Sequence, residues 1–278
     1  MTNSTFPIVI ENQAGLSEMA DVLTWLDTQV DQYKDQLASA GAILFRGFPV
    51  KTAEDFDVFS AAFAYGDFTY KESLSNAVRI NFTPRVFTAN EAPPDVEIFL
   101  HHEMAQTPIH PEKIFFCCLA AAEKGGATPL CRSDHLYSAF KSEHPDWAAQ
   151  FKELGLKYTT HIPATDDNES GQGRSWRSTL SVASKVEAEN RLKDLGYSWQ
   201  WQPDESLIAT TPALPAVREL PDGGESFFNQ VLAAYCGWKP VEDNGKPVLT
   251  FGNGEHIPKQ VLDSLVQLSK NFIYPAEW

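Results

Sequence analysis

The apolar residues of this chain come in short runs, which limits every strand to a few residues. The longest run covers 114–122 and is far shorter than the roughly 20 apolar residues of a membrane-spanning helix. Short β-prone segments recur at 42–45, 78–81, 98–102, 114–120, 199–202, 207–210 and 248–251. Segment 114–120 is apolar throughout, which is typical of a central strand buried on both faces. The sequence therefore predicts a sheet of many short strands.

Segments with helical periodicity lie between these strands. Apolar residues at three- and four-residue steps predict one amphipathic helix over 16–39. Further helices are expected from Thr52, over 133–140, from Pro145, over 182–195 and from Pro258, because threonine and proline suit helix starts. The pattern is α+β, with a β sandwich or barrel as core. We expect one domain over 1–278, with a helical insertion around 133–196.

Composition limits the classes of partner that the protein can bind and indicates its cellular compartment. The chain has 278 residues, 43% of them hydrophobic, and a net charge of −15. Such an acidic surface argues against nucleic acid and anionic membranes as partners. The four cysteines form no Cys-x-x-Cys pair, and residues 1–10 lack the basic and apolar parts of a secretory signal. We therefore expect reduced thiols and a cytoplasmic protein.

One pair of residues carries the strongest chemical signal. His101 and Glu103 are two residues apart in a β-prone segment, so in a strand their side chains share a face. An imidazole and a carboxylate on one face can grip one metal ion, as in the 2-His-1-carboxylate triad. His102 points to the opposite face and is expected to have a structural or supporting role.

A second motif follows about twenty residues later. Gly125 and Gly126 allow a tight turn, and the Thr128 hydroxyl after them can bind a carboxylate. Alternatively, Thr128 is a turn residue that caps the helix near Ser133.

Together, six segments resemble one known family. They are GAILFRGF at 41–48, LHHEMAQTPIHPEKIFF at 100–116, GGATPL at 125–130, SWRSTL at 175–180, FFNQVLAAYCGW at 227–238 and LTFGNGEHIP at 249–258. In this order they resemble the clavaminate synthase-like branch of the taurine dioxygenase family. The resemblance covers nearly the whole chain.

The resemblance implies a fold and an activity. The fold would be a double-stranded β-helix, or jelly roll, with flanking helices. The activity would be that of an Fe(II)- and 2-oxoglutarate-dependent oxygenase, which couples decarboxylation of 2-oxoglutarate by O₂ to oxidation of a C–H bond in a small molecule. By this resemblance His101 and Glu103 bind iron, and Thr128 binds 2-oxoglutarate.

The resemblance also exposes a departure. Members of the family carry a distal histidine ligand and an arginine in a strand after the helix that here begins at Pro258. This sequence stops at Trp278, where that strand is expected to begin. We expect a chain shortened at its C-terminus, with an incomplete jelly roll. The alternatives are a natural short form without iron chemistry, and completion of the site by another residue such as His256. Open strand edges favour pairing, so we expect a homo-oligomer.

Three residues are candidates for contact with the substrate. Asn90, Arg174 and Trp176 lie near the metal segment or after a glycine-rich loop and are candidate substrate residues. The expected substrate is a small neutral or cationic molecule, such as an amino-acid derivative. Two other functions stay open: a zinc hydrolase that uses the same His/Glu pair, and an oxygenase-like protein that binds a ligand or partner without catalysis.

Overall fold

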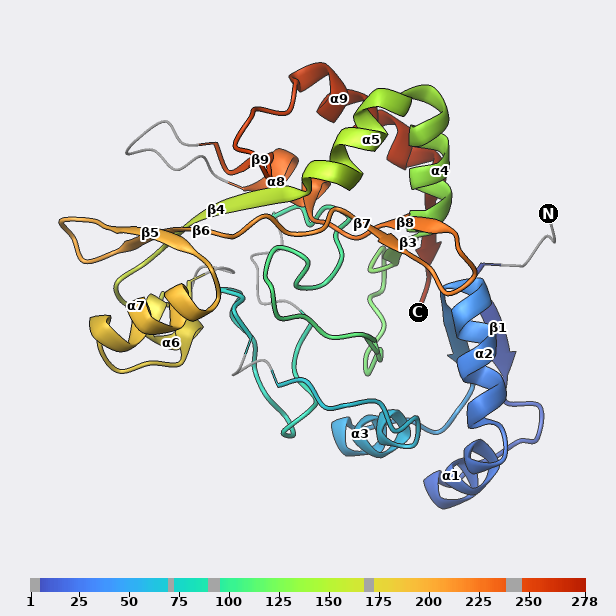
Figure 1. The fold of residues 1–278 in the computed structure, drawn as a ribbon. Coiled ribbons are helices and arrows are strands. Elements are labelled where there is room, and N and C mark those ends of the chain that lie inside the picture. The colour runs from blue at the N-terminus through green and yellow to red at the C-terminus, as the bar shows by residue number, and fades with distance from the viewer. Residues whose placement is uncertain (1–5, 70–72, 90–95, 168–172, 239–246) are drawn as a thin grey trace.

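The structure is a computed structural model that describes residues 6–69, 73–89, 96–167, 173–238 and 247–278. Its N-terminal part contains β1 (Ile8–Glu11), α1 (Met19–Asp27), α2 (Val30–Ala40), β2 (Ile43–Arg46) and α3 (Ala53–Ala61). β1 and β2 form a parallel pair, and the three helices pack around an aromatic cluster (Figure 1). Thr52 and Asp55 form a reciprocal capping box at the start of α3, as the sequence predicts.

The single helix expected over 16–39 is wrong, because the chain breaks it at Thr28 and Gln29. The Thr28 hydroxyl donates to the Trp25 carbonyl at 2.7 Å, and the Gln29 amide donates to the Leu26 carbonyl. These bonds end α1, and α2 begins at Val30. Threonine often competes in this way with the helical hydrogen bonds.

A long irregular segment follows α3. No helix or strand is present in the described parts of 62–127, where a single isolated β-bridge joins Asn81 and Phe87. The central strand expected over 114–120 is therefore wrong, as are the strands at 78–81 and 98–102. Ile114 and Phe116 are 52% and 46% exposed, while Phe115 between them packs against the N-terminal aromatic cluster. The run therefore has only one covered face and does not cross a sheet.

The region 128–276 is regular, and its elements can be followed from green to red in Figure 1. Its helices are α4 (Ser133–Glu143), α5 (Pro145–Leu154), α6 (Trp176–Leu180), α7 (Lys185–Asp194), α8 (Val231–Gly237), α9 (Lys259–Ser269) and the 3₁₀ turn η1 (Lys270–Phe272). Its strands are β3 (Thr128–Cys131), β4 (Leu156–Ile162), β5 (Ser198–Trp201), β6 (Leu207–Thr210), β7 (Val217–Glu219), β8 (Glu225–Phe227), β9 (Leu249–Phe251) and β10 (Ile273–Ala276).

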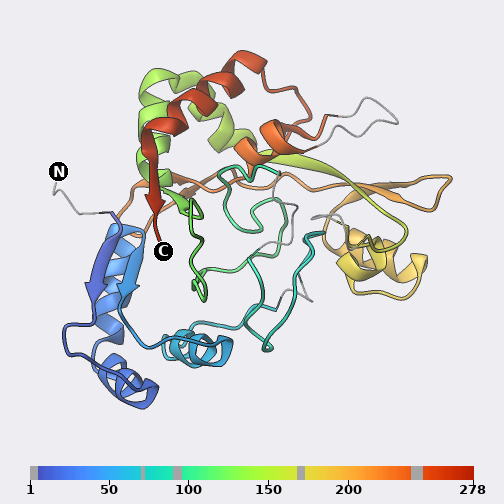
Figure 2. The ribbon, with the colours of Figure 1, turned by 180° about the vertical axis from the view of Figure 1, so that it is seen from behind.

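The largest sheet has the order β5-β6-β4-β9, and each neighbouring pair is antiparallel. α4, α5, α8 and α9 cover its β4–β9 end and share a core that includes Phe140, Phe151 and Phe251. α6 and α7 pack against β5 and β6 around Trp176 and Leu192. Seen from both sides, the irregular segment crosses the space between these two helical groups and the N-terminal part (Figures 1 and 2).

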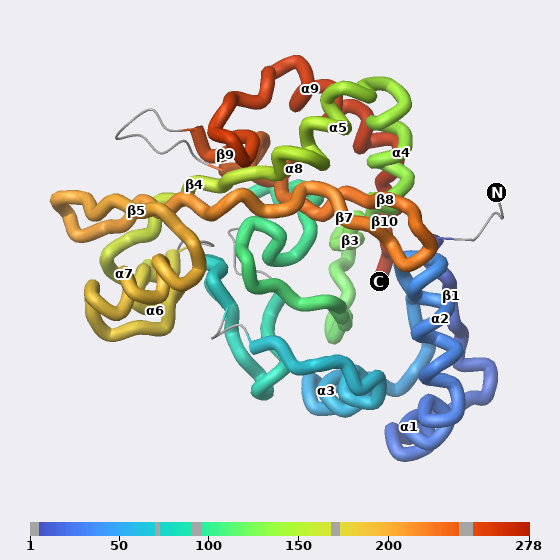
Figure 3. Tube along the Cα trace, in the orientation of Figure 1, coloured from blue at the N-terminus to red at the C-terminus, as the bar shows by residue number. Residues whose placement is uncertain are grey.

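Two smaller sheets complete the described strands. β7 pairs with β8, and β3 pairs antiparallel with β10, so segments far apart in sequence run side by side (Figure 3). The register places Thr128 opposite Ala276.

The α+β class is confirmed. The described strands lie in one four-stranded and three two-stranded sheets, so the jelly roll and the single domain remain predictions. The region expected as a helical insertion also contains β4, an inner strand of the largest sheet. None of the described helices has the length and apolar character that crossing a membrane requires.

Candidate metal centre

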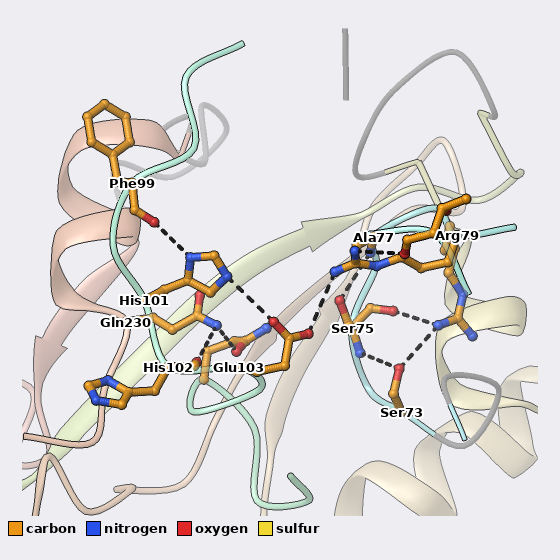
Figure 4. Close-up of polar contacts among 12 residues, drawn as sticks. Ser73, Ser75, Ala77, Arg79, Phe99, His101, His102, Glu103 and Gln230 are labelled. Atoms are coloured by element: carbon orange, nitrogen blue, oxygen red, sulfur yellow. Dashed lines mark hydrogen bonds and ion pairs between the residues drawn. The ribbon is translucent and has the colours of Figure 1, made fainter. Parts of the chain in front are cut away.

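His101 and Glu103 come together although their segment is not a strand. The chain around them is irregular and turns at Glu103, yet the two side chains converge (Figure 4). His101 Nε2 lies 3.5 Å from Glu103 Oε2, and the side chains are 30% and 19% exposed. The spacing of two residues therefore predicted the convergence, while the strand on which the argument rested is absent.

The backbone sets the form of the His101 ring. Nδ1 lies 2.7 Å from the Phe99 carbonyl oxygen, which can only accept a hydrogen bond. Nδ1 therefore carries a proton, and in the neutral ring the lone pair is on Nε2, the atom that faces Glu103. Metal-binding histidines are commonly oriented by such a bond to a carbonyl.

The pKa of His101 reflects this setting. Burial lowers it, but the hydrogen bonds to Glu103 and to the Phe99 carbonyl outweigh burial, so the pKa is raised overall. The protonated ring is therefore favoured beside the Glu103 carboxylate.

His102 is tied to the regular part of the molecule. Its Nε2 lies 2.7 Å from the Ser133 hydroxyl, and its Nδ1 lies 2.9 Å from the Asn229 carbonyl oxygen. The Gln230 side chain donates to the His102 carbonyl at 3.1 Å. Burial lowers the pKa of His102, which favours the neutral ring. The expected structural role of His102 is confirmed, because it fastens the segment that carries His101 and Glu103.

Sequence reasoning missed Arg79. Its Nη2 lies 3.7 Å from Glu103 Oε1, and its side chain is 11% exposed (Figure 4). A charged residue inside the β-prone segment 78–81 was the available signal, since a buried arginine needs an anionic or carbonyl partner. Sequence could not say that the partner lies more than twenty residues later.

The pair fits two neighbouring positions of a metal ion. Metal–ligand distances for imidazole nitrogen and carboxylate oxygen are about 2.0–2.2 Å, so a small closure from 3.5 Å brings both atoms onto one ion. Among the described residues, no group of three His, Cys, Asp or Glu side chains is arranged for a metal. His256 lies exposed in the turn after β9. A third protein ligand is therefore not identified in the described parts of the chain.

Thr128 lies at the start of β3, beside β10. Its hydroxyl accepts a hydrogen bond of 3.0 Å from the Trp278 indole nitrogen. The expected alternative, a cap on α4, is not seen: α4 has no side-chain cap, and Arg132 occupies the N-cap position. A threonine hydroxyl has one donor and two acceptor positions, so this contact leaves its O–H able to bind a carboxylate.

Two of the candidate substrate residues, Arg174 and Trp176, occupy structural positions. Arg174 donates to the Ser75 carbonyl at 2.7 Å and to the Ser178 carbonyl at 2.5 Å, and it borders an open cavity of about 520 Å³. Trp176 is fully buried in the core under α6 and α7. Asn90 lies outside the described residues. Substrate roles for these three residues stay predictions.

Comparison with known proteins agrees with the motifs. Residues 12–278 match the family model described as taurine catabolism dioxygenase TauD, TfdA family. The chain is 34% identical over 254 residues to the clavaminate synthase-like protein At3g21360 of Arabidopsis thaliana, covering 91% of this chain and 76% of that protein. It is 26% identical over 257 residues to the dapdiamide synthesis protein DdaC of Enterobacter agglomerans, covering 86% and 74%. On these matches the chain belongs to the TauD/TfdA dioxygenase family.

Proposed function

We propose that this protein is an Fe(II)- and 2-oxoglutarate-dependent oxygenase of a small molecule. The observation that carries the proposal is the 3.5 Å approach of His101 Nε2 to Glu103 Oε2, with the ring oriented by the Phe99 carbonyl. Family membership supports the same cofactors. Fe(II) with 2-oxoglutarate and O₂ would supply oxidation of an unreactive C–H bond.

The residues have separate tasks in this proposal. His101 and Glu103 hold the metal through Nε2 and Oε2, and the Thr128 hydroxyl donates to a carboxylate of 2-oxoglutarate. His102, through Ser133 and Asn229, keeps the metal-binding segment against the regular core. Two measurements distinguish this function from zinc hydrolysis. They are the metal content of the purified protein and the dependence of its activity on 2-oxoglutarate.

The substrate proposal is broader. One relative is named for dapdiamide synthesis and the other as clavaminate synthase-like. We infer that the substrate is a small molecule, and the net charge of −15 favours a neutral or cationic one such as an amino-acid derivative. A cytoplasmic location and a homo-oligomer are part of the same proposal.

The test is an anaerobic titration of the chain with Fe(II) and 2-oxoglutarate, followed by the metal-to-ligand charge-transfer absorption. We expect a band for the unaltered chain, its loss in His101→Ala and Glu103→Ala, and its weakening in Thr128→Ala. His135→Ala is the matched control, because this exposed histidine lies on α4.

Two further measurements complete the test. Admission of O₂ to the loaded protein should release succinate, which a binding protein without catalysis would not produce. Absence of the band from the unaltered chain would overturn the proposal for this chain. A band that His256→Ala abolishes would identify the third ligand.

A further inference from the structure

Glu103 has two carboxylate oxygens, and they face different partners. Oε2 faces His101 Nε2 at 3.5 Å, whereas Oε1 faces Arg79 Nη2 at 3.7 Å. The carboxylate therefore lies between a ring and a guanidinium, as Figure 4 shows. Both oxygens of a freely rotating carboxylate are equivalent as ligands, but here the surroundings distinguish them.

Arg79 is itself held in place. Its Nη1 donates to the Thr88 carbonyl at 3.2 Å, and the Thr88 amide donates to the Ile80 carbonyl at 2.9 Å. The Ile80 amide in turn donates to the Thr88 hydroxyl at 3.0 Å. Arg79 thus extends from a small hydrogen-bonded loop and is not a mobile surface side chain.

The start of this loop is fastened to the regular part of the molecule. Arg174 bonds the Ser75 carbonyl through its side chain, and its backbone amide donates to the Asn76 carbonyl at 3.1 Å. Arg174, which also bonds Ser178 in α6, therefore anchors residues 75–76, a few positions before Arg79 in the chain.

We propose that Arg79 is a positioning residue, which holds Glu103 Oε1 and so directs Oε2 to the metal. The inference rests on the proposed metal site but concerns a residue outside its ligand set. Outer partners of metal-binding carboxylates commonly fix the orientation of the ligand and raise its affinity. Arginine suits the task because its planar guanidinium stays charged and can hold a carbonyl and a carboxylate with different nitrogens.

The experiment measures binding of Co(II), a spectroscopic substitute for Fe(II) that needs no oxygen chemistry. The variants are Arg79→Gln, Arg79→Lys and, as a matched control, Arg177→Gln, which removes an exposed guanidinium stacked on Trp176. The readouts are the Co(II) dissociation constant and the visible Co(II) spectrum, which reports the ligand arrangement. Thermal unfolding of each metal-free variant establishes that it is folded.

We expect Arg79→Gln to weaken Co(II) binding by about 10–100-fold and to change the spectrum. Arg79→Lys should recover part of the affinity, since it restores the charge without the planar group. The control should bind as the unaltered protein does. A merely structural role would lower the melting temperature without changing the spectrum.

Two results would overturn the inference in distinguishable ways. Equal affinity and an identical spectrum in folded Arg79→Gln, beside normal binding by the unaltered chain, would refute the role of Arg79 alone. Failure of the unaltered chain to bind Co(II), with no difference from His101→Ala, would refute the metal site and with it this inference.

Discussion

The irregular segment 73–127 and the regular region 128–276 divide the work of the molecule differently. The irregular segment supplies His101, Glu103 and Arg79, while the regular region supplies Asn229 and Arg174, which fasten that segment through His102 and Ser75. Most of the fully buried large side chains lie in the regular region. The difference teaches that ligand geometry here depends on side-chain bonds to a stable core, not on the backbone ladder of a strand.

The largest expected effect is a loss of folding stability on mutation of the core of the regular region. Phe151→Ala empties a fully buried site in the core of α4, α5, α9 and β9, and should destabilise the protein by about 3–5 kcal/mol. Urea unfolding followed by far-ultraviolet circular dichroism measures this loss. A cost below about 1 kcal/mol would show that this core is not the stable part of the comparison.

The second prediction concerns His102, whose hydrogen bonds attach the irregular segment to the regular region. His102→Phe keeps a ring but leaves the Ser133 hydroxyl and the Asn229 carbonyl without their imidazole partner, at a cost of about 1–3 kcal/mol. Hydrogen exchange should rise in residues 99–107 more than in β4. Equal rises in both would mean that His102 belongs to the global core and not to an attachment.

A third, pH-dependent effect concerns the attachment of the irregular segment to α3. A hydrogen bond from Thr83, and then the Arg85 guanidinium 2.8 Å from Oδ1, hold the pKa of Asp57 below its usual value against the effect of burial. The folded state thus binds the proton more weakly than the unfolded state. The stability from this carboxylate is present above about pH 4 and is lost as the pH falls through the lowered pKa.

Asp57→Asn tests that sign. The variant should lose about 1–2 kcal/mol at pH 7, and its difference from the unaltered protein should shrink between about pH 4 and pH 3. Urea unfolding at each pH gives the difference. A gap that stays constant down to pH 3 would contradict the role of the charged carboxylate.

The smallest expected effect is that of removing an exposed apolar side chain from the irregular segment. Ile114→Ala removes a side chain that is 52% exposed in the irregular segment, so its cost should stay within about 0.5 kcal/mol. The same urea measurement applies. A cost as large as that of Phe151→Ala would mean that another part of the chain or a partner covers Ile114 in solution.

What sequence predicts well here is local. The starts of α3, α5 and α9 follow from Thr52, Pro145 and Pro258, whose chemistry acts within one helical turn. β5, β6 and β9 appear where β-prone runs predict them. The failure at 114–120 has a physical reason: an apolar run records that burial is available, not that neighbouring strands exist to pair with it.

In the candidate site too, sequence predicts the local features and misses the contacts between distant segments. The approach of His101 to Glu103 could be predicted from their spacing of two residues, although the strand assumed for that prediction is absent. Arg79 depends on a contact between segments that only the folded chain brings together. The burial of Trp176 likewise depends on α7 and β5, which close over it.

The ladder between β3 and β10 also has a consequence for the order of synthesis. Thr128 and Trp278 are separated by 150 residues, and their hydrogen bond joins one end of that ladder. A ribosome makes Thr128 150 residues before Trp278, so the Thr128 hydroxyl exists long before the strand that sets its position. Contacts of such long sequence separation form late and slowly. The Thr128 hydroxyl, which is proposed to bind 2-oxoglutarate, is thus expected to take its place later than the local pair His101 and Glu103.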